Sequence, residues 1–117
     1  MTSDDIYELV MNNGKMVQET FLHIHYACVS KLNILFDYYD SNVIALICYN
    51  VTRNIIAYIY DNQSLFADKF YISKRSLERA HKDLERMPKI EYPDEYDVNR
   101  LNIIEQMITK VYYVKTD

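Results

Sequence analysis

The chain has 117 residues, half of them hydrophobic, and a net charge of −4. This length suits a single domain, residues 1–117, with enough apolar material for a core. The longest apolar run, residues 43–49, is far shorter than the ~20 residues that a membrane span needs, and the acidic N-terminus lacks the layout of a signal peptide. We therefore expect no membrane association.

Two residue types narrow the function classes further. Gly14 is the only glycine, whereas phosphate-cradling loops need several glycines because the backbone must approach the anion closely. The common nucleotide-binding motifs are therefore excluded, and we predict no cofactor, no small-molecule ligand and no enzymatic activity. Cys28 and Cys48 are too few for the framework of a disulfide-stapled secreted fold, which predicts a reducing, cytoplasmic setting.

The first half of the chain is predicted to be mostly helical. Thr2 or Ser3 can cap a short helix with apolar residues at positions 6, 9 and 10, ending near residues 12–14. Residues 15–39 fit both a helix and a strand, and we favour a helix for most of this range. Polar residues 40–42 break the pattern, and residues 43–49 then predict a buried helix. Residues 55–60 are rich in β-branched and aromatic side chains, which predicts a strand.

Residues 64–87 have the layout of a helix-turn-helix whose second helix is capped by Ser73. The apolar residues of this second helix fall on one stripe at helical spacing: Leu77, Ala80, Leu84 and Met87. Its cations cluster on the opposite face: Arg75, Arg79, Lys82 and Arg86. Such a helix has one side for the core and one side for a polyanion.

The charge distribution supports this interpretation. Residues 69–89 hold seven of the thirteen Lys and Arg residues against three carboxylates, so this window carries +4 and the rest of the chain −8. A concentrated positive patch on an acidic body can still dock and orient on a polyphosphate. The sequence therefore predicts binding to double-stranded DNA.

The C-terminal third completes the predicted layout. Pro88 ends the basic helix, and residues 92–95 form a turn. Helical spacing returns in residues 98–108 through Val98, Leu101, Ile104 and Ile108. Residues 110–115 alternate like an edge strand. The expected fold is mainly α with a small β component.

This order of elements resembles the winged helix-turn-helix fold, over about residues 42–92, with extra helical segments at both ends. The segment ISKRSLERAHKDLE, residues 72–85, is similar to DNA-binding regulators and replication initiators of phages, viruses and plasmids. The resemblance implies a transcriptional or replication regulator of a virus or mobile element. It also implies that Lys74, Arg75, Ser76 and Arg79 face base edges, whereas Lys82 and Arg86 face phosphates.

Two alternatives stay open. His23 and His25, if on a strand, would place both imidazoles on one side, and Tyr71 with Lys74 matches a Tyr-x-x-Lys helix, so the chain also resembles rolling-circle nicking endonucleases. A zinc site built from His23, His25 and Cys28 is disfavoured because structural zinc normally takes four ligands, so no metal is predicted. The second alternative is a small helical module that binds other proteins, since the twelve tyrosines are a residue type enriched in interfaces.

The C-terminal segment also predicts a homodimer. The apolar stripe of residues 98–108 and the edge strand of residues 110–115 both lie outside the compact helix-turn-helix unit. Many regulators gain affinity by placing two recognition helices about one DNA turn apart. The competing prediction is that this segment folds back on the core of its own monomer.

Overall fold

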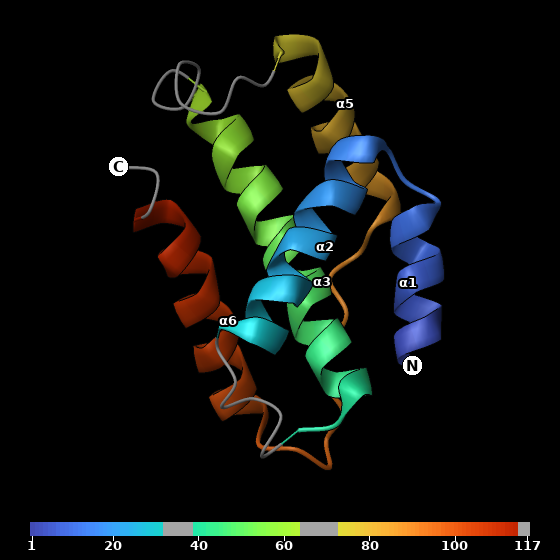
Figure 1. Cartoon of the computed structure of the whole chain (residues 1–117), viewed down its shortest axis with the longest axis vertical. Coiled ribbons are helices and arrows are strands. Elements are labelled where there is room, and N and C mark those ends of the chain that lie inside the picture. Colours follow the sequence, from blue (N-terminus) through green and yellow to red (C-terminus); the bar gives the residue numbers. More distant parts are fainter. Residues whose placement is uncertain (32–38, 64–72, 115–117) are drawn as a thin grey trace.

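The computed structural model describes residues 1–31, 39–63 and 73–114, with the side chains of residues 112–114 left aside. Its central element is α3, Ser41–Asp61, a 21-residue helix in the middle of the molecule (Figure 1). The helices α1, α2, α5 and α6 all pack against it. Residues 43–52 are buried without interruption, as expected for a helix covered on every side.

The N-terminal helices form as the sequence predicts. α1, Ser3–Met11, begins at a capping box in which the Thr2 side chain accepts from the Asp5 amide and the Asp5 carboxylate accepts from the Thr2 amide. α2, Lys15–Ser30, follows after the turn at residues 12–14. It buries Val17, Phe21, Ile24 and Cys28, which confirms the helical spacing of this range. The rest of that range, residues 32–38, lies outside the described residues.

The predicted strand at residues 55–60 is wrong, because these residues are the last two turns of α3. Ile55, Ile56 and Ile59 are buried at helical spacing on the same helix as Val51. The helix already begins at Asp40, whose carboxylate caps it by accepting from the Val43 amide at 3.0 Å. Burial on a long helix therefore overrides the local preference of β-branched residues for strands.

The winged helix-turn-helix is also wrong, because the part of the chain that the structure describes contains helices and no strand. Where a wing was expected, residues 87–92 run along α3 as an irregular segment. The Tyr49 hydroxyl donates to the Pro88 carbonyl at 2.7 Å, and Arg53 donates to the Met87 carbonyl. Asn50 donates to the Ile90 carbonyl at 2.9 Å and accepts from its amide at 3.3 Å. Side chains of α3 thus satisfy the backbone groups that a β-hairpin would have paired.

The last described helix, α6, spans Val98–Val114. Residues 110–114 belong to this helix, so the edge strand predicted from residue 110 onward is wrong. The turn that precedes it is confirmed, with the Tyr96 amide donating to the Pro93 carbonyl at 3.1 Å. Leu101 and Ile108 are buried against α3, and Val98 and Ile104 pack partly against the same core. The stripe proposed for a dimer therefore folds back on its own monomer. Homodimerisation itself stays a prediction.

One helix, α3, is long and apolar enough to cross a membrane by length and composition. Of the window that meets this test, 72% is buried inside the protein. The same residues are apolar because they form the centre of the core, from which four other helices exclude water.

Candidate nucleic-acid interface

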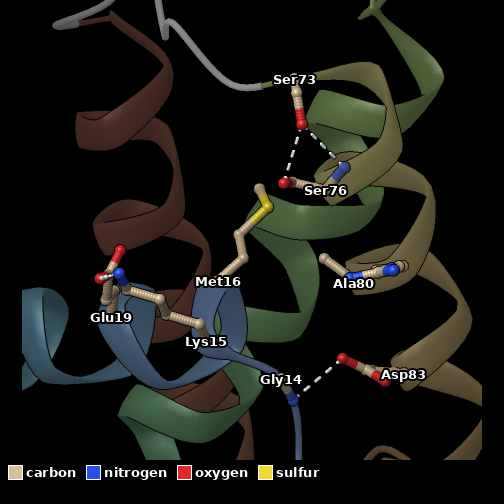
Figure 2. Close-up of a pocket in the computed structure, with 9 residues that line it drawn as sticks. Gly14, Lys15, Met16, Glu19, Ser73, Ser76, Ala80 and Asp83 are labelled. Carbon is tan, nitrogen blue, oxygen red and sulfur yellow. Dashed lines mark hydrogen bonds and ion pairs between the residues drawn. The ribbon is translucent and has the colours of Figure 1, made fainter.

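The helix predicted to bind DNA is α5, Lys74–Asp83, and its start follows from one serine. Ser73 has an extended backbone, and its hydroxyl oxygen accepts a hydrogen bond from the Ser76 amide at 3.1 Å, which confirms the predicted cap. The Ser73 hydroxyl also donates to the Ser76 hydroxyl at 2.8 Å (Figure 2). The first half of the predicted helix-turn-helix, residues 64–72, lies outside the described residues.

The apolar side of α5 is placed as the sequence predicts. Leu77 and Ala80 are buried, Leu84 packs partly against the core, and Met87 is fully buried just beyond the helix. The regular helix is shorter than expected, because Leu84–Arg86 tightens into the 3₁₀ turn η2 and Pro88 follows soon after. The orientation of α5 is therefore fixed by side chains on one face and by its two ends.

All six residues predicted to contact DNA are exposed. Lys74, Arg75, Ser76, Arg79 and Lys82 lie on α5, and Arg86 lies on η2. We call the four cations of α5 the basic face: Lys74, Arg75, Arg79 and Lys82. Within the described residues, none of these four side chains forms an ion pair with a carboxylate. The exposed carboxylate on the same helix is Glu78. The structure thus brings the predicted cations together on a solvent-exposed surface.

Asp83 is a residue of this site whose role the sequence did not indicate. It is 8% exposed, its Oδ2 accepts from the Gly14 amide at 3.1 Å, and its Oδ1 pairs with Arg86. The carboxylate therefore links the end of α5 to the turn between α1 and α2. It also holds the Arg86 side chain against the end of α5. The sequence contained one indication that Asp83 is buried: it follows Ala80 by three residues, which places it on the buried side of the helix.

Two shallow cavities flank the basic face where α5 meets the α1–α2 turn. The first, of about 460 Å³, is shown in Figure 2 and is lined by Gly14, Lys15, Met16, Glu19, Ser73, Ser76, Arg79, Ala80 and Asp83. The second, of about 450 Å³, is lined by residues 12–14 together with Arg79, Lys82, Asp83, Glu85 and Arg86. Both cavities mix cations and carboxylates, and Lys15 pairs with Glu19 at 3.6 Å. Arg79 lines both cavities and so stands at the centre of this surface.

The two histidines of the nicking-endonuclease alternative do not form the pair that it requires. Both lie on α2, and residues two apart on a helix point in different directions, unlike on a strand. His23 is exposed, whereas the His25 ring lies 3.4 Å from the Tyr7 hydroxyl and stacks on Phe21, and its burial lowers its pKa. Tyr71 falls outside the described residues. Among the residues described, no three His, Cys, Asp or Glu side chains could hold a metal ion together.

Comparison of the chain with protein-family models, with curated proteins and with solved structures finds no match.

Proposed function

We propose that this protein binds double-stranded DNA through the basic face of α5, in a regulatory role. The observation that carries the proposal is the separation of the two sides of α5. Leu77 and Ala80 anchor the helix in the core, while Lys74, Arg75, Arg79 and Lys82 extend into solvent on a ten-residue helix. A phosphate backbone is the polyanion that such a row of cations attracts, because each neutralised phosphate releases condensed counterions.

The spacing of the cations supports contact with one groove. Arg75, Arg79 and Lys82 are four and three residues apart, so they project from neighbouring turns on one side of α5. The helix rises ~1.5 Å per residue, which places successive cations roughly 4.5–6 Å apart along its axis. The acidic remainder of the chain would orient the protein, since residues 69–89 carry a formal charge of +4 and the other residues together −8. No β-wing is part of this proposal.

The proposal is tested by titrating a fluorescent 20-base-pair duplex at several salt concentrations. The parent protein should bind at low salt, and its affinity should fall linearly with salt on logarithmic axes. The double variant Arg79→Ala, Lys82→Ala should bind more weakly, and the loss of the Lys82 phosphate contact should lower the salt slope by about one unit.

A matched control removes the same charge elsewhere. Lys31 follows the last residue of α2, Lys110 lies on α6, and both are exposed. The C-terminal end of α2 and the helix α6 lie away from α5 (Figure 1). Lys31→Ala, Lys110→Ala should leave the slope unchanged, and circular dichroism should show that both double variants remain helical. A parent protein that does not bind duplex at low salt, or two double variants that lose affinity equally, would overturn the proposal.

A second candidate function is binding to another protein through α2. Leu22, Tyr26 and Val29 are 46%, 63% and 39% exposed, and their spacing of four and three residues places them on one side of the helix. Contiguous exposed apolar side chains of this kind are typical of protein-interaction surfaces. The duplex titration separates the two functions, because a protein-binding module with no affinity for DNA would give no salt-sensitive shift.

A further inference from the structure

The two cysteines of the chain lie side by side although they are 20 residues apart in sequence. Cys28 projects from α2 and Cys48 from α3, and the two sulfur atoms are 3.7 Å apart. Both side chains are free thiols with no exposed surface. The sequence alone left them as two unrelated residues, and the packing of α2 on α3 brings them together.

We propose that Cys28 and Cys48 form an oxidisable dithiol, which closes to a disulfide linking α2 to α3. A disulfide needs sulfur atoms ~2.05 Å apart, so the thiols must approach by less than 2 Å, roughly what small changes in their side-chain torsions can supply. No other cysteine competes, because these two are the only ones in the chain. The proposal is independent of DNA binding.

The two sulfur atoms have different roles. The Cys48 thiol donates a hydrogen bond to the Cys28 sulfur, and this bond lowers the pKa of Cys28 and raises that of Cys48. Cys28 therefore ionises first and is the nucleophile. It also lies on the more peripheral helix, since α2 exposes Leu22, Tyr26 and Val29 to solvent whereas α3 is surrounded. An outward movement of α2 would admit a small oxidant to Cys28 before Cys48.

A peroxide is an oxidant of suitable size, and the chemistry balances with it alone. The Cys28 thiolate attacks one oxygen of hydrogen peroxide, the O–O bond breaks, and the leaving hydroxide takes a proton to become water. Cys48 then loses its proton and attacks the sulfur of the resulting sulfenic acid. The S–S bond forms, the S–OH bond breaks, and a second water leaves. The two thiols supply two electrons and two protons, and one peroxide becomes two waters.

The crosslink would tie together the scaffold that holds α5. Both α2 and α3 pack against α5, and the disulfide would close a loop of 20 residues. Closing a loop of this size restricts the unfolded chain, and for a domain of this length we expect the melting temperature to rise by roughly 10 °C.

The experiment exposes the folded, intact protein to hydrogen peroxide without denaturant and records its intact mass. The expected product is a monomer lighter by about 2 Da, the mass of the two hydrogen atoms lost. A digest without reductant should contain the peptide pair that carries Cys28 and Cys48, and dithiothreitol should restore the original mass and melting temperature.

Cys28→Ala and Cys48→Ala serve as matched controls, and neither should lose this mass. Three outcomes would overturn the proposal in the parent protein: added oxygen without loss of hydrogen, a disulfide between two chains, or an unchanged mass. The proposal would also be overturned if the mass loss occurred in urea but not in the folded protein, because the fold would then hold the two sulfur atoms apart.

Discussion

The Gly14 amide donates a hydrogen bond to Asp83 Oδ2 at 3.1 Å, and a Cβ atom on residue 14 would lie 2.8 Å from that same oxygen. The turn between α1 and α2 therefore approaches the end of α5 more closely than a side chain allows. This approach, and not the backbone angles, favours glycine here, because Gly14 has an ordinary φ of −69° and a Cβ atom would displace the Asp83 carboxylate. The contact joins the N-terminal helices to the helix that carries the basic face.

The first prediction follows from this contact. Gly14→Ala should lower the free energy of unfolding by roughly 1 kcal/mol, because the added methyl group would push the Asp83 carboxylate away from the Gly14 amide. Urea unfolding of the single variants Gly14→Ala and Asp83→Ala and of the double variant measures the coupling. Because Asp83→Ala removes the oxygen that the new methyl group meets, the double variant should lose less than the sum of the single losses. Strict additivity within about 0.5 kcal/mol would contradict the clash.

The second prediction concerns Glu105, a carboxylate with no exposed surface inside the α3–α6 contact. It accepts hydrogen bonds from the Tyr92 hydroxyl at 2.8 Å and from Asn54 Nδ2 at 3.1 Å, and Lys89 Nζ lies 3.4 Å away. Tyr92→Phe removes one donor and should cost about 1–3 kcal/mol of unfolding free energy, because a buried charged oxygen loses its partner. Tyr26→Phe, on an exposed ring, is the control and should change little.

The same tyrosine predicts how stability changes at alkaline pH. Burial, and then the neighbouring Glu105 carboxylate, raise the pKa of Tyr92 well above the usual value of 10.0. A pKa that is higher in the folded state stabilises the protein below the pKa of the unfolded chain, and this contribution is lost as pH rises above about 10. Unfolding free energies between pH 8 and 11 should therefore fall less steeply in Tyr92→Phe than in the parent. Equal slopes would show that Tyr92 does not contribute to the loss of stability at alkaline pH.

The fourth prediction separates the two sides of α6. Ile108 is 5% exposed and Ile103 is 60% exposed, although both are isoleucines on the same helix. Ile108→Asp would bury an unpaired charge in the core and should leave the protein largely unfolded, as measured by circular dichroism. Ile103→Asp should keep the helical signal within error. If light scattering shows a dimer for the parent and a monomer for Ile103→Asp, the dimer uses the outer side of α6 and not the stripe first proposed.

Local sequence determined most of the helices and their ends. Thr2 and Ser73 act as caps because hydroxyl oxygens accept from the first free amides of a helix, and those amides lie within three residues of the cap. The apolar side and the basic face of α5 could be predicted for the same reason, since helical spacing alone decides which residues share a face.

Tertiary packing decided the rest. Residues 55–60 have side chains that suit a strand, yet they continue α3 because the helix buries Ile55, Ile56 and Ile59 on one side in the core. The wing is replaced by residues 87–92, whose backbone groups bond to Tyr49, Asn50 and Arg53 from 34 to 40 residues away in sequence.

The burial of Asp83 and Glu105 and the pairing of Cys28 with Cys48 depend in the same way on partners distant in sequence. Spacing along one helix shows which way a side chain points but not what lies opposite. Local spacing therefore determined the helices and the basic face, whereas the contacts between helices determined which polar and sulfur-bearing groups meet.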